Sequence, residues 1–250
     1  MKLPSSKSFL AACALCVASV TVSTAATVST GDLLIGFRTT TNDGSQGSSY
    51  SYIVNVGQAS LYGGDTGAVT NVGADLAAIF GDNWATRTDI QWGVIGTAGV
   101  SNIYLSKAET TSGVNPDGWV FGSTAEINTV RSDIRAIYGI SNPGGFDEST
   151  ATINLAGGRE SNSSTNSWRS YLNPDQYPAN SDLDSPGNIE GLLSNNLALF
   201  HTTGAGAAGT SYVTTFTIDS TGQISAVPEP SSLLTLAGGS LLLFVRRRRA

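Results

Sequence analysis

The sequence predicts an α+β, strand-rich fold, in which a single antiparallel β domain carries two or three short helices between two apolar ends. Only 13% of the 250 residues are charged and 29 are glycine, a composition that suits short strands and turns better than long surface helices. Apolar residues alternate with other residues in several segments, which is the pattern of half-buried strands. Strands and helices do not alternate regularly, which disfavours a doubly wound parallel sheet.

Five segments carry the alternation that predicts strands. Their alternating positions are Leu33, Ile35 and Phe37; Tyr50, Tyr52, Val54 and Val56; Ile90, Trp92 and Val94; Ile103 and Leu105; and Tyr212, Thr214, Phe216 and Ile218. A Ser-Thr-Gly-Gln turn at 220–223 then leads to a short run at 224–227. The chain shows no internal repeat and is long enough to bury a core.

The clearest predicted helix runs from about residue 124 to 138. Ser123 and Glu126 form an S-x-x-E capping box, which satisfies two backbone donors at the start of a helix. Gly139 supplies a C-terminal stop. The apolar residues of one face are Ile127, Val130, Ile134 and Ile137.

Two other segments also predict helices. Residues 75–80 predict a short helix that Gly81 ends. Ser185-Pro186 predicts the start of a third helix, because proline suits the first helical position. The apolar members of that helix are Ile189, Leu192 and Leu193. The stretch 142–184 before it is polar and turn-rich, so we expect a long surface excursion there rather than a domain boundary.

The charge distribution excludes a nucleic-acid partner. Six of the 13 basic residues lie at the two ends of the chain. With Glu229 set aside, the interior holds 7 basic residues against 18 acidic ones, a net charge of −11. Phosphate binding needs clustered lysine and arginine, so such a domain should repel nucleic acid and anionic lipid.

The N-terminus has the three parts of a secretory signal. Lys2 and Lys7 form the basic head, residues 9–22 form the apolar run, and small residues follow. We expect cleavage after Ala25 or Ala26, which makes residues 1–26 a signal peptide that signal peptidase removes.

Both cysteines of the chain, Cys13 and Cys16, lie in this apolar run. The exported domain would then have no disulfide and no cysteine-ligated metal. An alternative is a lipobox at 10–13, with Cys13 as a lipid-carrying N-terminus. The apolar run before Cys13 is short for that interpretation.

The C-terminus combines Pro228, Glu229 and Pro230 with an apolar run at 231–245. The two prolines hold the chain extended and remove two backbone donors, so a protease can grip the segment. As a helix the apolar run spans only about 22 Å, short of a hydrocarbon core of about 30 Å. Basic side chains beyond it can snorkel to the headgroups and stay cytoplasmic. They are Arg246, Arg247, Arg248 and Arg249.

A Pro-Glu-Pro motif, a short apolar helix and a terminal arginine cluster, in that order, resemble the PEP-CTERM sorting signal. The resemblance covers roughly the last 24 residues. It implies cleavage near the motif by exosortase, an integral-membrane cysteine transpeptidase. It also implies a Gram-negative host that makes exopolysaccharide, and an extracellular or matrix destination. On physical grounds alone a plain tail anchor remains open.

The sequence therefore divides into a signal peptide at 1–26, a secreted strand-rich domain at 27–225 and a PEP-CTERM sorting tail at 227–250. The resemblance implies nothing about the chemistry of the central domain. We expect an inner-membrane-anchored intermediate, held by residues 231–245, before release to the cell surface or the medium.

Two motifs of the central domain have simpler structural interpretations. Gly204, Gly206 and Gly209 spell G-x-G-x-x-G, but a predicted strand follows where a dinucleotide fold needs a helix, so we expect a hairpin loop. His201 is the only histidine, and no G-x-S-x-G elbow accompanies it. We expect a structural or surface histidine, no transition-metal site, no cofactor and no catalytic residue.

Oxygen-bearing residues gather late in the chain, at Asn173, Asp175, Asn180, Asp182, Asp184 and Glu190. Such ligands suit Ca²⁺, although read from residue 180 the cluster lacks the glycine and the final glutamate of an EF-hand. Solvated turns are the simpler interpretation. The same acids are also candidates for a glycosidase pair.

The four tryptophans, Trp84, Trp92, Trp119 and Trp168, stand out in so polar a chain. We expect core packing for each of them. The alternative is exposed aromatic rings that stack on sugars, for Trp119 and Trp168 in particular.

Two functions are consistent with these features. The first is a noncatalytic cell-surface or matrix protein that associates with exopolysaccharide. The alternative is a secreted carboxylate-dependent hydrolase that acts on polysaccharide. The first is favoured because the scarce His, Cys and Lys residues form no catalytic constellation.

Overall fold

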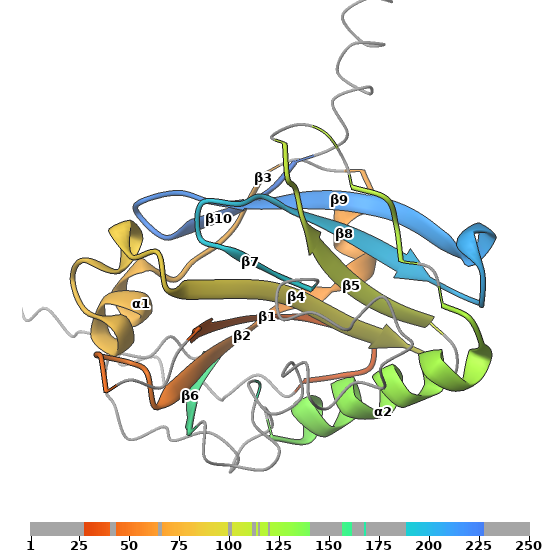
Figure 1. Ribbon diagram of the computed structural model, residues 1–250, viewed down its shortest axis with the longest axis horizontal. Helices are drawn as coiled ribbons and strands as arrows, with labels where there is room; N and C mark the ends of the chain where they lie inside the picture. The colour runs from red at the N-terminus through yellow and green to blue at the C-terminus, as the bar shows by residue number, and fades with distance from the viewer. Residues whose placement is uncertain are drawn as a thin grey trace, which may run out of the picture.

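The structure is a computed structural model. It describes residues 28–40, 44–64, 67–99, 102–111, 114, 116–119, 121–140, 157–161, 168 and 189–227. The described strands join in one sheet of ten, and all their pairings are antiparallel. Figure 1 shows the sheet curling until its C-terminal strands lie over its N-terminal strands, a nearly barrel-shaped form. The predicted strand-rich antiparallel fold is confirmed.

The strands of the sheet are β1 (Asp32–Thr39), β2 (Tyr50–Gln58), β3 (Gly67–Asn71), β4 (Ile90–Ala98), β5 (Asn102–Ala108), β6 (Gly157–Ser161), β7 (Glu190–Leu192), β8 (Leu197–Thr202), β9 (Thr210–Ile218) and β10 (Gln223–Val227). Their order across the sheet is β3-β10-β9-β8-β5-β4-β1-β2-β6, and β7 pairs with β4 away from this path. The α-helices are α1 (Gly73–Phe80) and α2 (Thr124–Ile140).

The sheet is buried on both faces at its centre. Every residue of β1 is buried, and alternate side chains join different apolar clusters. Leu33, Ile35 and Phe37 point into the inner core with Trp92 and Phe216. The intervening Leu34 joins the outer core, which α2 covers (Figure 1). The alternation in the sequence therefore marks the inner face correctly but does not show that the other face is covered.

The outer core depends on the apolar face of α2. Its four predicted apolar positions are 0–4% exposed. The Ser123 Oγ accepts from the Glu126 backbone N at 3.3 Å, as the capping box predicts. The Glu126 carboxylate accepts instead from the backbone N of Gly122, at 2.8 Å. The helix continues through Gly139 to Ile140, so the predicted glycine stop falls slightly early.

Helix α1 confirms the predicted short helix at 75–80. It buries Leu76 and Phe80 in the inner core, and its C-terminal residue is followed by Gly81 in a left-handed conformation with φ of 95°. Asp75 lies in the first turn and is buried, where it accepts a hydrogen bond from the Tyr52 hydroxyl at 2.5 Å. Burial raises the pKa of Tyr52 well above its ordinary value, and the nearby Asp75 carboxylate adds to that rise.

The predicted third helix is wrong in its described part. Residues 190–192 form β7, which pairs with β4, and a turn follows in which the Asn195 N donates to the Leu192 carbonyl. Its predicted start at 185–186 lies outside the described residues.

Strands β3, β6 and β8 were also not predicted. β8 is buried at five of its six positions, so its run of apolar residues shows no alternation for sequence analysis to detect.

Strand β10 is the last described element. It lies between β3 and β9, with Ile224 and Ala226 in the inner core. The Thr214 hydroxyl donates to the carbonyl of Val227, the final residue of the strand, at 3.0 Å. The C-terminal segment therefore begins directly at the sheet.

Candidate functional site

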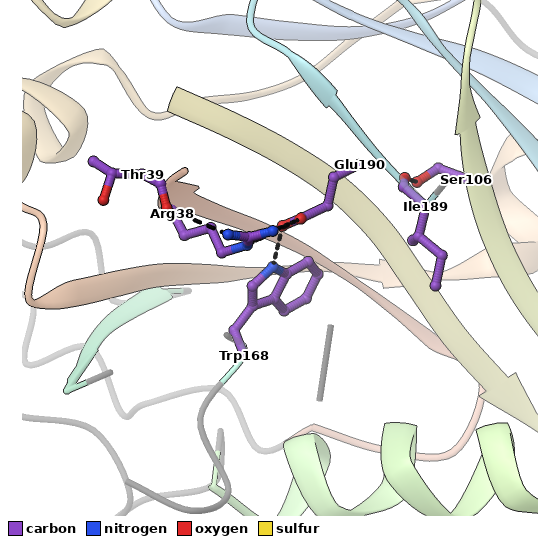
Figure 2. Close-up of polar contacts among 6 residues, drawn as sticks. All are labelled: Arg38, Thr39, Ser106, Trp168, Ile189 and Glu190. Carbon is purple, nitrogen blue, oxygen red and sulfur yellow. Dashed lines mark hydrogen bonds and ion pairs between the residues drawn. The ribbon is translucent and has the colours of Figure 1, made fainter. Parts of the chain in front are cut away.

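A buried ion pair joins β1 to β7 on the outer face of the sheet (Figure 2). The Arg38 and Glu190 side chains are 6% and 2% exposed. The Arg38 Nε donates to both carboxylate oxygens of Glu190 at 2.9 Å, and its Nη2 donates to Oε2 at 2.5 Å. Its Nη1 reaches the Thr39 carbonyl at 3.3 Å. The guanidinium donors thus pair with the carboxylate oxygens, so that each buried charge is compensated and hydrogen-bonded, as buried ions require.

Trp168 completes this cluster from a distant part of the chain. Its indole Nε1 donates to the Glu190 Oε1 at 2.9 Å, as Figure 2 shows, and the side chain is fully buried. The ring lies over Gly36, where an added Cβ would come within 2.3 Å of it. Gly93 pairs with Gly36 across β1 and β4, and an added Cβ there would lie 3.5 Å from the ring. Gly36 thus makes room for the indole on the sheet, whereas an added Cβ at Gly93 would first meet the Glu190 side chain and the Ile189 carbonyl, at 3.1 and 3.3 Å.

Ser106 fixes the start of β7 against β4 and β5. Its hydroxyl donates to the Ile189 carbonyl at 2.6 Å and accepts from the Val94 N at 2.7 Å. Glu190 follows directly in the chain, so its backbone is held where its carboxylate meets Arg38 (Figure 2).

The geometry suits a structural contact between strands better than a reactive site. Arg38 and Trp168 together donate four hydrogen bonds to the two oxygens of Glu190. These donors occupy the acceptor sites of the carboxylate, which leaves it poorly placed to hold a metal ion or to activate water. This geometry favours a structural role for Glu190 over the Ca²⁺-ligand and glycosidase-acid alternatives.

The remaining members of the acidic cluster, residues 173–184, lie outside the described residues. Among the residues that the structure describes, no group of three or more His, Cys, Asp or Glu side chains is arranged to hold a metal ion. For the rest of the chain, the absence of a transition-metal site and the Ca²⁺ alternative stay predictions.

His201 lies on β8, opposite Tyr104 on β5, and the two rings stack with centroids 4.5 Å apart. Burial lowers the pKa of His201 and raises that of Tyr104, so both rings stay neutral near pH 7. The His201 Nε2 is buried and has no hydrogen-bond partner among the described residues. The arrangement is that of a structural histidine.

The G-x-G-x-x-G segment forms the loop between β8 and β9, as predicted. Gly206 has a φ of 82°, and its N donates to the Phe121 carbonyl just before α2, at 2.9 Å. The strand that follows, β9, excludes the helix N-terminus on which a dinucleotide phosphate would lie.

All four tryptophans are buried, at 0–5% exposure. The expectation of core packing is confirmed. The alternative, in which Trp119 or Trp168 is exposed and stacks on sugars, is wrong. Trp119 lies within the outer core, where the Lys107 ammonium lies 4.9 Å from the ring centroid.

The sequence contained one signal of the Arg38–Glu190 pair. Arg38 is a charged residue that directly follows the apolar positions of a predicted strand.

The processing residues predicted from the two ends lie outside the described part of the chain. These are Ala25, Ala26, Pro228, Glu229, Pro230 and Arg246 to Arg249. Among the described residues no helix has both the length and the apolar character needed to cross a membrane. The predicted membrane segment at 231–245 lies outside the described residues.

Comparison with known proteins identifies the C-terminal segment. The family model of the PEP-CTERM protein-sorting motif matches residues 226–249. No family model matches the central domain. No curated protein and no solved structure shows significant similarity to the chain. The motif marks an exported protein that exosortase-type machinery sorts to the cell surface.

Proposed function

Because the chain carries this sorting motif, we propose that residues 27–225 form a noncatalytic cell-surface or matrix domain that associates with exopolysaccharide after export. The sorting motif at 226–249 carries the proposal, since it directs the domain to the outside of the cell. The buried acid Glu190 holds strands together rather than facing a cleft, which supports a noncatalytic role.

The position of β10 supports a specific order of events. Signal peptidase removes the N-terminus near Ala25 or Ala26. The chain then stalls at residues 246–249, because moving four arginines through hydrocarbon costs several kcal/mol. Residues 228–230, between β10 and the membrane segment, span at most about 11 Å, so the sheet lies close to the membrane surface. The transpeptidase then cuts near Pro228–Pro230 and frees the domain.

The intact mass of protein recovered from the cell surface and the medium tests this order. We expect a mass that lacks both ends. Alanines at Pro228, Glu229 and Pro230 should trap a membrane-bound precursor. Neutral residues at 246–249 should instead weaken retention before cutting. A mature mass that still includes residues 233–250 would show an ordinary tail anchor.

The matrix role is tested with the purified domain and the exopolysaccharide of the host. We expect weak binding in a pull-down and no change in the chain length of the polysaccharide. Rapid depolymerisation would contradict the noncatalytic proposal and identify a hydrolase. Absence of any binding would contradict the association with exopolysaccharide.

A further inference from the structure

Three segments that are far apart in the sequence line an open cavity of about 300 Å³ at one end of the sheet. They are residues 84–88 before β4, residues 192–194 at the end of β7, and residues 218–220 at the end of β9. The volume is at the small end of the range for small-molecule sites. It suits one or two sugar rings rather than a long segment of polymer.

The wall of the cavity combines an apolar part with a polar rim. Trp84, Leu192, Leu193 and Ile218 supply apolar surface. The rim has four exposed hydroxyl side chains, Thr86, Thr88, Ser194 and Ser220. Sugar rings have the matching character, with apolar C–H faces and hydroxyl groups at their edges. A few convergent polar groups on an apolar wall are the usual composition of a ligand site.

Trp84 adds an unused hydrogen-bond donor to this wall. The residue is only 5% exposed, yet no acceptor among the described residues bonds to its indole Nε1. The Nε1 of Trp92, by contrast, donates to the Asn195 carbonyl at 3.2 Å, and that of Trp168 donates to Glu190. The Nε1 of Trp119 also lacks a partner among the described residues, but that atom is fully buried, whereas the Nε1 of Trp84 is not among the fully buried atoms. The Trp84 N–H is therefore within reach of solvent, and an acceptor in the cavity can bond to it.

The charge of the rim selects against anionic ligands. The Arg87 guanidinium is committed to the Asp89 carboxylate and to the carbonyls of Gln46 and Phe80. The exposed Asp219 carboxylate therefore remains as the uncompensated charge. The Thr221 hydroxyl and backbone donors of the turn hold the pKa of Asp219 below its ordinary value, which keeps it ionised.

We propose that this cavity binds one or two rings of a neutral, hydroxyl-rich saccharide, with Trp84 as donor and the rim hydroxyls as further partners. The proposal rests on the proposed function and names the place where the domain contacts exopolysaccharide. The cavity lies at the start of β10, whereas the tail leaves from its end at Val227. The cavity and Val227 therefore lie at opposite ends of β10.

The test is a titration of the ¹⁵N-labelled domain with neutral di- and trisaccharides of glucose, galactose and mannose. We expect at least one of these sugars to shift the indole N–H signal of Trp84, which the variant Trp84→Phe identifies. That variant should weaken binding by about three- to tenfold, the effect of one neutral hydrogen bond. If none of the sugars moves the Trp84 signal, the site is refuted.

A pair of exposed serines provides the matched variants. Ser194→Trp fills the cavity from its rim and should weaken binding at least tenfold. Ser211→Trp makes the same change at the far end of β9 and should bind normally. Equal binding by both variants would overturn the cavity as the site.

The same variants separate this inference from the proposed function. If the exopolysaccharide pull-down succeeds equally with Ser194→Trp and the wild type, the matrix role stands and the cavity is refuted. If short sugars shift Trp84 but the polymer is not retained, the cavity stands and the matrix role is refuted. Trigalacturonate should bind at least tenfold more weakly than the best neutral sugar, and Asp219→Asn should reduce that difference.

Discussion

At the scale of single residues, Arg38 and Glu190 are the most demanding feature of the domain. Both side chains are almost completely buried, and their carboxylate–guanidinium contact is the reason that the burial is tolerated. The attraction between the two ions offsets the free-energy cost of removing each of them from water.

Removing one member of this pair should therefore destabilise the domain strongly. We expect Arg38→Met or Glu190→Met to lower the free energy of unfolding by about 3–5 kcal/mol, because each leaves an unpaired buried charge. The double variant should recover part of that loss. Urea denaturation of the wild type and the three variants measures the coupling. Additive losses would mean that the two charges do not interact in the folded domain.

Asp133 on α2 gives a pH-dependent prediction. Burial raises the pKa of its half-buried carboxyl to about 6. Because the folded state holds the proton more tightly, the contribution of this group to stability is fully present below the unfolded pKa and is lost as pH rises through about 6. After allowance for solvent screening, the loss at neutral pH is about 1 kcal/mol.

We therefore expect Asp133→Asn to raise the Tm at pH 7 by about 2–4 °C and to change it little at pH 4. Thermal unfolding at both pH values measures the effect. Asp82→Asn, at an exposed position, is the matched control and should change the Tm little at either pH. A gain for Asp133→Asn at pH 4 equal to that at pH 7 would contradict the titration of Asp133.

Among the elements of the sheet, Gly36 of β1 decides how a remote segment docks. Gly36 and Gly93 stand opposite each other, and Trp168 lies over them. Neither glycine is needed for its backbone angle, since neither has a positive φ. The reason for glycine at Gly36 is the close approach of the indole ring.

Gly36→Ala should accordingly destabilise the domain by about 1–3 kcal/mol, as expected for overpacking. Gly63→Ala is the control, because an added Cβ there has no neighbour within 4 Å. In a Trp168→Ala background the cost of Gly36→Ala should fall to near that of the control. Chemical denaturation of the four variants checks this. An unchanged cost in that background would mean that the indole is not what excludes the methyl group.

The segment around β7 shows why local sequence signals fail for short elements. Ser185-Pro186 and the apolar residues after it are typical of a helix start, yet residues 190–192 pair with β4. Pairing with β4 and the contact of Glu190 with Arg38 outweigh a weak local helix preference. The pairing of β7 with β4 also places residues 192–194 beside the cavity.

At the scale of the whole molecule, the boundary between the domain and the sorting tail is abrupt. The sorting-motif match begins at residue 226, inside β10, whose Ile224 and Ala226 are 0% and 2% exposed. The processing enzyme must therefore act beyond Val227 if the sheet is to stay complete.

Two truncations test this boundary. Removal of residues 228–250 should leave the Tm of the domain within about 2 °C, a change of less than about 1 kcal/mol. Removal of 223–250 should abolish cooperative unfolding, because β10 is lost from between β3 and β9 and Ile224 alone contributes about 2 kcal/mol. Near-identical unfolding curves for the two truncated proteins would show that β10 is dispensable.

Features that depend only on neighbouring residues could be predicted from the sequence. These are the order of parts at the two ends, the alternation of β1, β2, β4, β5 and β9, the apolar face and cap of α2, and the hairpin loop at 204–209. Each is a local signal, because side-chain periodicity and turn chemistry act over a few residues.

Four features could be recognised only in the folded domain: the Arg38–Glu190 pair, the docking of Trp168 over Gly36, the strand character of β7 and the cavity beside Trp84. Each joins residues that are far apart in the chain, and Arg38 and Glu190 are separated by 152 positions. The alternation of a strand fixes which face a side chain occupies, but not which distant segment covers that face. That choice depends on how volumes and charges fit once the sheet has curled, and no local pattern contains it.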